Sequence, residues 1–109
     1  MIAEVRDKQQ ELAALCERFE VIRLGVFGSA ARKDFDPSKS DLDFLVLFDR
    51  RDDADYLDRF FGLLWALEAL FDRPVDLVTE LSLRKPRLRA TIEQDLESLY
   101  VRPGVVSAA

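Results

Sequence analysis

Apolar residues recur at intervals of three and four in three parts of the chain, with charged residues between them. In a helix this spacing places the apolar side chains on one face, so the pattern predicts helices over residues 3–19, 54–71 and 88–99. Asp52 and Asp53 are the N-cap candidates of the middle helix, because a short acidic side chain can accept from the first backbone N–H groups. The expected apolar face of the last helix consists of Leu88, Ile92, Leu96 and Leu99.

Three apolar runs between these helices have the length of β-strands and cover residues 21–28, 42–48 and 75–79. The middle run is almost unbroken apolar sequence, which favours a central strand covered on both faces. Residues 29–33 are expected to start a short helical turn, and residues 34–40 to form a loop. The order helix, strand, strand, helix, strand, helix is typical of an α/β (α+β) layer fold. It predicts a small mixed sheet of three or more strands flanked by helices.

The helix predicted over residues 54–71 has more apolar side chains than one packing face needs, since a helix on a sheet uses a stripe of about 100°. These side chains are Tyr56, Leu57, Phe60, Phe61, Leu63, Leu64, Trp65, Leu67, Leu70 and Phe71. The surplus favours a second surface that a partner covers. The alternative is a larger core than three strands imply. Gly62, in the middle of this helix, would allow a neighbouring element to approach closely.

Two carboxylates stand at the start of the 42–48 run. Asp41 and Asp43 are two residues apart in an extended segment, so their side chains project to the same face. Two bare carboxylates this close repel each other unless a cation lies between them. Mg²⁺ removes the repulsion and usually takes phosphate oxygens as further ligands. The pattern therefore indicates a metal-bound nucleotide, and a solvated strand end is the alternative.

A small-residue turn follows the first predicted strand. Because Gly28 has no Cβ, a phosphate can approach the backbone there, and Ser29 offers a hydroxyl and an N–H group. A plain strand-to-loop turn is the simpler interpretation, and the two are compatible. Arg32, three residues after Ser29, either binds the same phosphates through two N–H groups or is solvated.

A third carboxylate, Asp76, lies in the strand predicted over residues 75–79. A charged group in such a strand is costly unless it is paired or ligated. The interpretations are a metal ligand or base on one hand and a salt bridge with Arg73 or Arg84 on the other.

These residues resemble the motif of the DNA polymerase beta type nucleotidyltransferases, and most closely that of the minimal nucleotidyltransferase (MNT) domains. The matching residues are Gly28, Ser29, Arg32, Ser40, Asp41 and Asp43, with Asp76 at the place of a third carboxylate. The resemblance covers roughly residues 20–100. It departs from the family pattern at Lys33, where the family very often has glycine.

The resemblance implies a polymerase beta-like fold and a metal-dependent adenylyltransferase. Asp41, Asp43 and Asp76 would be the catalytic residues and would hold Mg²⁺, two ions in most such sites, with Mn²⁺ as a substitute. The substrate would be ATP, bound by Gly28, Ser29, Arg32 and Ser40.

The resemblance also implies a protein partner. MNT domains are commonly antitoxins of HEPN-domain toxins, which are all-helical ribonucleases, and members of the family transfer AMP to a tyrosine of the toxin. We therefore expect an antitoxin in a hetero-oligomer with its toxin. A non-catalytic module that masks its partner sterically is the alternative, and a small-molecule nucleotidyltransferase is a third hypothesis.

Composition narrows the classes of site and partner. The net charge is −5, so direct binding of nucleic acid is not expected. There is no histidine and one cysteine, Cys16, which argues against a zinc site and an intramolecular disulfide. The sequence has neither a secretory signal nor an apolar stretch long enough for a membrane span, and we expect a cytoplasmic protein.

Length and composition also set the expected domain boundaries. The 109 residues are 49% hydrophobic, which is enough for one domain with its own core. We place this nucleotidyltransferase domain at residues 1–102 and a flexible tail at residues 103–109.

One basic run precedes the last predicted helix and consists of Arg84, Lys85, Arg87 and Arg89. It is expected to be solvated, and a contact with a triphosphate or an acidic partner is the alternative.

Overall fold

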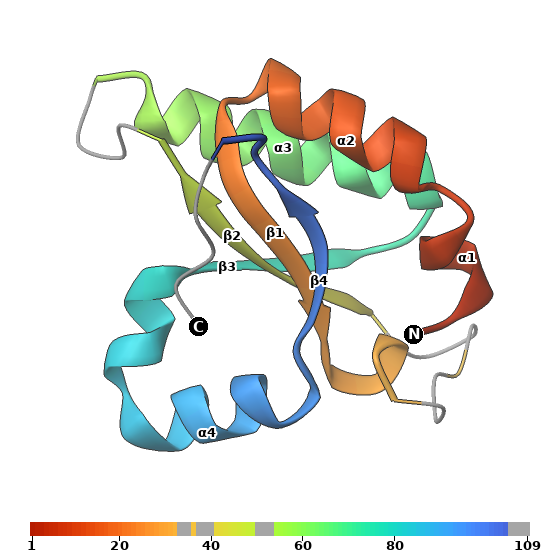
Figure 1. Ribbon diagram of the computed structural model, residues 1–109, viewed down its shortest axis with the longest axis vertical. Coiled ribbons are helices and arrows are strands. Elements are labelled where there is room, and N and C mark those ends of the chain that lie inside the picture. Colours follow the sequence, from red (N-terminus) through yellow and green to blue (C-terminus); the bar gives the residue numbers. More distant parts are fainter. Residues whose placement is uncertain (33–35, 37–40, 50–53, 105–109) are drawn as a thin grey trace.

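The computed structural model describes residues 1–32, 36, 41–49 and 54–104. Figure 1 shows a twisted sheet with helices packed around it. In chain order the elements are α1 (Ala3–Arg6), α2 (Gln9–Arg18), β1 (Val21–Phe27), η1 (Gly28–Ala30), β2 (Leu42–Phe48), α3 (Tyr56–Phe71), β3 (Val75–Thr79), η2 (Glu80–Arg84), α4 (Pro86–Asp95) and β4 (Glu97–Val101), where η marks a 3₁₀ turn.

Within the described residues, the strands form a four-stranded mixed sheet in the order β3-β2-β1-β4. Strand β1 is antiparallel to both β2 and β4, whereas β2 and β3 are parallel. Helix α3 supplies the crossover that a parallel pair requires. Helices α2 and α3 lie together at the top of Figure 1, and α4 lies apart from them at the lower left. The expected mixed sheet flanked by helices is therefore confirmed.

The hydrophobic core lies between the sheet and helices α2 and α3. Alternate residues of β2, among them Phe44 and Val46, are fully buried there, and the ring of Phe44 stacks on Phe71 of α3 at 5.8 Å. On the other face of β2, Leu45 and Leu47 are only half-buried. The prediction of a central strand covered on both faces is therefore met in full on one face and only in part on the other.

The half-covered face of the sheet borders a hollow of about 360 Å³. Leu45 and Leu47 line it from β2, Leu83 lines it from η2, and Leu96 lines it from the segment between α4 and β4. A short 3₁₀ turn and one ten-residue helix cover less area than the paired helices on the opposite face. The sheet therefore has one closed face and one partly open face.

The predicted first helix over residues 3–19 is divided into α1 and α2. The chain bends at Lys8, whose backbone leaves the helical region. The bend lets the N-terminal segment reach η1, where the backbone N–H of Ile2 donates to the carbonyl of Ala30 (2.9 Å). Tertiary contact thus overrides the helical period in this segment.

The predicted last helix was wrong beyond residue 95. Helix α4 ends at Asp95, Leu96 is extended, and β4 follows. Two residues expected on the helical face, Leu96 and Leu99, thus lie outside the helix. The open edge of β1 explains the difference, because β4 pairs with it from Glu97 to Val101 and satisfies backbone groups that a longer helix would leave unpaired.

Helix α3 begins close to its predicted start, and its N-cap is Asp55, whose side chain makes no capping hydrogen bond. The predicted caps, Asp52 and Asp53, lie outside the described residues. A Cβ at Gly62 would clash with the ring of Phe19, so this glycine does allow the close approach of α2 to α3. In the described part of the chain, no helix combines the length and apolar character of a membrane span.

Candidate active site

Gly28 joins β1 to η1 in a conformation that favours glycine. Its φ of +69° lies in the left-handed region, which side chains with a Cβ rarely adopt. A Cβ built at this position would also clash with Oδ2 of Asp43. The glycine therefore lets the carboxylate of Asp43 lie directly against the backbone of the turn.

The central pair of the site is formed by Asp43 of β2 and Asp76 of β3. The two residues are register partners in the parallel strands, and their side chains are hydrogen-bonded to each other. The pKa of the Asp43 carboxyl is raised from 3.8 to about 6, chiefly by burial and then by the charges of Asp76 and Asp41, whereas the Arg32 guanidinium opposes the rise. The raised pKa favours the neutral form of Asp43 unless a cation binds beside it.

Asp41, the remaining carboxylate of the predicted site, is exposed just before β2. Among the described residues, no three acidic, cysteine or histidine side chains form a group arranged to hold a metal ion. The donor chemistry nevertheless fits a hard cation, because Asp41, Asp43 and Asp76 offer only carboxylate oxygens and the last two already crowd one another. Asp43 and Asp76 are thus in contact, and Asp41 is close enough for its charge to act on Asp43.

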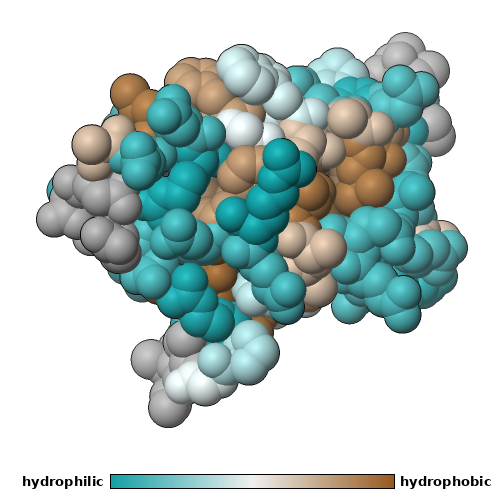
Figure 2. All heavy atoms as spheres, turned by 90° about the horizontal axis from the view of Figure 1, so that it is seen from above, coloured by the Kyte–Doolittle hydropathy of each residue, from teal (hydrophilic) through white to brown (hydrophobic). Residues whose placement is uncertain are grey.

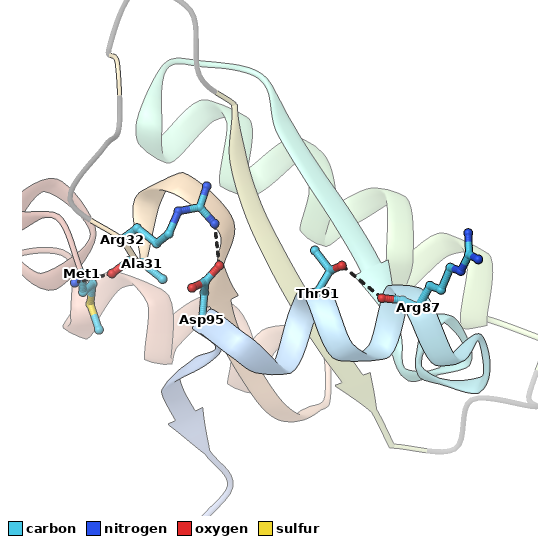
Figure 3. A network of polar contacts seen from close by, with 6 residues as sticks. All are labelled: Met1, Ala31, Arg32, Arg87, Thr91 and Asp95. Atoms are coloured by element: carbon cyan, nitrogen blue, oxygen red, sulfur yellow. Dashed lines mark hydrogen bonds and ion pairs between the residues drawn. The ribbon is translucent and has the colours of Figure 1, made fainter.

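Arg32 follows η1, and its backbone N–H donates to the carbonyl of Gly28 at 3.1 Å. Its guanidinium Nη1 donates to Oδ2 of Asp95, the last residue of α4, at 2.5 Å (Figure 3). The Arg32 side chain is 48% exposed and that of Asp95 only 11%. Ser29 lies half-buried within η1, between Gly28 and Arg32 in the chain.

Asp95 is the residue of this region that the sequence did not reveal. In the sequence it is one acidic residue within the helix predicted over residues 88–99, and many surface helices contain such residues. Ser40 and Lys33 lie outside the described residues, so the predicted role of Ser40 stays a prediction.

Two arginines discussed in the sequence analysis have carboxylate partners in the structure. Arg73, named as one alternative partner of Asp76, donates to Glu4 of α1 at 3.1 Å. The basic run on η2 and α4 is exposed, and Arg89 pairs with Glu93 on the surface of α4 (2.9 Å). These contacts favour the solvated interpretation of that run.

The comparisons with known proteins agree with this geometry. The sequence profile of the nucleotidyltransferase domain family matches residues 9–99. A Methanocaldococcus jannaschii protein with the provisional name protein adenylyltransferase MJ0128 is 37% identical over 101 residues, covering 92% of this chain and 97% of that protein.

Two solved structures show the same fold. A protein provisionally described as a minimal nucleotidyltransferase has a TM-score of 0.69 and 34% identity, covering 85% of this chain and 90% of its own. The second belongs to the complex of tri-AMPylated Shewanella oneidensis HEPN toxin with MNT antitoxin. It has a TM-score of 0.59 and 20% identity over 89% of this chain and 72% of its own, a likeness of fold alone.

Proposed function

The chain belongs to the nucleotidyltransferase domain family, and from this premise we propose that it is an antitoxin that AMPylates its toxin. It transfers AMP from ATP to a hydroxyl side chain, a tyrosine, of a helical HEPN-type ribonuclease and so neutralises it in the cytoplasm. The observation that carries this proposal is the contact of Asp43 with Asp76 directly against the side-chain-free Gly28.

The reaction is a displacement at the α-phosphorus of ATP. The tyrosine oxygen forms a bond to that phosphorus, the bond to the bridging oxygen of pyrophosphate breaks, and pyrophosphate leaves. Asp76 takes the phenolic proton, since the chain has no histidine to serve as a base. Two Mg²⁺ ions, or Mn²⁺ in their place, would be held by Asp41, Asp43 and Asp76. The ions would neutralise the charge on the attacking and leaving oxygens.

The triphosphate is assigned to the turn after β1. Phosphate oxygens are assigned to the Gly28–Ser29 turn, where Ser29 offers its hydroxyl group. The guanidinium of Arg32 is half exposed beside this turn and supplies the positive charge for the outer phosphates. Ser40 is the remaining predicted contact.

The proposed partner surface is the outer side of α3. Part of its apolar surplus enters the core, since Leu63, Leu67 and Phe71 are buried. The rest is exposed: Leu57 by 64%, Phe61 by 42% and Trp65 by 64%. Figure 2 views the molecule from the side of α2 and α3 and shows apolar surface among the charged side chains. Exposed apolar patches of this kind mark protein interfaces.

Two relatives support an adenylyltransferase with a protein acceptor. The M. jannaschii relative carries the provisional name of a protein adenylyltransferase. In the S. oneidensis complex, the HEPN toxin is tri-AMPylated and bound to its MNT antitoxin.

The test incubates the chain, Mg²⁺ and α-labelled ATP with a HEPN protein from the same organism, and follows both the label and RNA cleavage. We expect label on a tyrosine of the HEPN protein and loss of its ribonuclease activity. In EDTA, or with the Asp43→Asn variant, we expect no label and no loss of ribonuclease activity. Inhibition on simple mixing without label would replace this proposal by steric masking. Label on a free small molecule would overturn both.

A further inference from the structure

The ion pair between Arg32 and Asp95 joins two parts of the chain that are 63 residues apart. Arg32 lies directly after the Gly28–Ala30 turn, and Asp95 closes α4. Figure 3 shows the guanidinium above the carboxylate, with α4 running away from the contact toward Arg87. The pair therefore fastens the turn after β1 to the end of a distant helix.

The carboxylate of Asp95 does not stabilise helix α4. The C-terminal end of a helix carries partial negative charge, so an acidic residue in the last turn is unfavourable. The side chain of Asp95 is also only 11% exposed, which adds a desolvation cost. Its cation, Arg32, offsets both effects, and the pairing rather than helix stability explains an aspartate here.

The packing of α4 fixes the position of Asp95. Ile92, three residues earlier and so on the same face of the helix, is fully buried. Helix α4 contacts both β1 and η1. The helix thus presents Asp95 to Arg32 from a position that the core holds.

The pair leaves Arg32 able to bind a further anion. A guanidinium has five N–H donors in a planar fork, and the contact with Oδ2 of Asp95 engages Nη1. The side chain is 48% exposed, and its charge is close enough to act on Asp43. Arg32 therefore lies at the site, and Asp95 helps to set its orientation.

We propose that Asp95 is a positioning residue for the nucleotide, which holds the Arg32 guanidinium beside the Gly28–Ser29 turn before the triphosphate binds. The inference rests on the proposed nucleotide site. An arginine ordered in advance loses less side-chain freedom on binding a phosphate than a mobile one does. The contribution of Asp95 is therefore to affinity, and it acts through Arg32.

The test measures binding of the α,β-methylene analogue of ATP with Mg²⁺ to the full chain by titration calorimetry. We expect Asp95→Ala to raise the Kd about five- to tenfold, the size expected when one preordered charged contact is lost. Asp95→Asn keeps an oxygen that can accept from Nη1 and should stay within about twofold of the unmodified protein. The matched control is Glu93→Ala, which breaks the Arg89–Glu93 pair on the exposed side of the same helix and should leave the Kd unchanged.

A double-mutant cycle separates positioning from a general effect on structure. In an Arg32→Ala background, Asp95→Ala should have no further effect on the Kd, because its only route to the nucleotide is gone. If Asp95→Ala does not fold, Asp95→Ser, whose side chain is too short to reach Arg32, takes its place with the same expected loss.

Four results would overturn the proposal. They are an unchanged Kd for Asp95→Ala, a lower Kd, an Asp95→Asn variant as weak as Asp95→Ala, and a loss that persists without Arg32. A lower Kd would mean that Asp95 competes with the phosphates. Absence of binding by the unmodified chain would refute the nucleotide site and this inference together, whereas binding that Asp95→Ala does not weaken refutes the inference alone.

Discussion

At the scale of single residues, Gly28 has the least freedom to change. Gly28→Ala would force a Cβ into the left-handed region and against Asp43. We expect the free energy of unfolding to fall by about 1–3 kcal/mol, and AMP transfer to fall at least about tenfold because Asp43 is displaced. Urea unfolding and the labelled-ATP assay measure the two effects.

Gly104→Ala is the control for this change. Gly104 also has a positive φ, +88°, but no atom lies within 4 Å of an added Cβ. Gly104→Ala should lower the free energy of unfolding, because of the strained backbone, but should leave AMP transfer unchanged. Equal transfer rates for the two variants would contradict the role assigned to the Gly28–Asp43 contact.

Asp43 makes the stability of the metal-free protein depend on pH. The pKa of its carboxyl rises from 3.8 to about 6 in the folded protein. A raised folded pKa means that the contribution to stability is complete below pH 3.8 and is lost as the pH rises through 6. Above that pH the ionised group opposes folding, so removing its charge should stabilise the protein.

Asp43→Asn is therefore expected to be more stable than the unmodified protein at pH 7 in EDTA. After allowance for screening at this half-exposed site, the gain should be about 1 kcal/mol. It should shrink toward zero at pH 3, which lies below both pKa values, so that Asp43 is largely protonated in both the folded and the unfolded state. Denaturant unfolding at the two pH values measures the gain, and equal gains at both would contradict the assignment of the shift to Asp43.

At the scale of elements, α3 serves the core with one side and is exposed on the other. Trp65→Glu adds a charge at a side chain that is 64% exposed, so the free energy of unfolding should change by less than about 0.5 kcal/mol. Association with the partner, or self-association, should weaken at least about tenfold, as expected for an aromatic residue at an interface. Sedimentation measures the association and urea unfolding the stability.

Two comparisons make the α3 experiment specific. Gln94→Glu adds the same charge to an exposed position of α4 and should leave association unchanged. Leu63→Ala, on the buried side of α3, should instead cost about 2–5 kcal/mol of stability. If charge substitutions at Leu57, Phe61 and Trp65 all leave association intact, this surface is not the interface.

The elements differ in how far local sequence determined them. The strands β2 and β3 were predicted with their observed bounds, because each is an apolar run with turn-forming residues beside it. The last predicted helix was wrong after Asp95, since Leu96 and Leu99 keep the helical period while the edge of β1 decides their conformation. The edge of β1 lies far from residues 96–99 in the sequence, so the local spacing of apolar residues cannot indicate that this segment pairs with it.

At the scale of the whole molecule, the site gathers residues from both halves of the chain. Gly28, Asp43 and Asp76 could be predicted because a family motif and the alternation of strand side chains mark them. Asp95 could not, because its role depends on how α4 packs against η1. Sequence thus predicted residues that the fold brings together, whereas only the tertiary fold shows that Asp95 holds Arg32.

Binding of Mg·ATP should stabilise the entire domain. At a ligand concentration 100 times the Kd, the gain is about 2.7 kcal/mol, and the melting temperature should rise by about 10 °C for a domain of this size. The same ATP concentration in EDTA, or with Asp43→Asn, should give no comparable shift. Scanning calorimetry measures it, and an equal rise without divalent cations would contradict a metal-dependent site.

The pairing of β1 with β4 also has a consequence for synthesis on the ribosome. Strand β1 and its neighbour β4 are far apart in the chain, so β4 emerges only after β2, α3, β3 and α4 have been translated. Until residues 95–101 have left the exit tunnel, a growing chain can form the β1–β2 hairpin but lacks the carboxylate that orients Arg32. A nascent chain should therefore gain full affinity for nucleotide only after residues 95–101 have emerged.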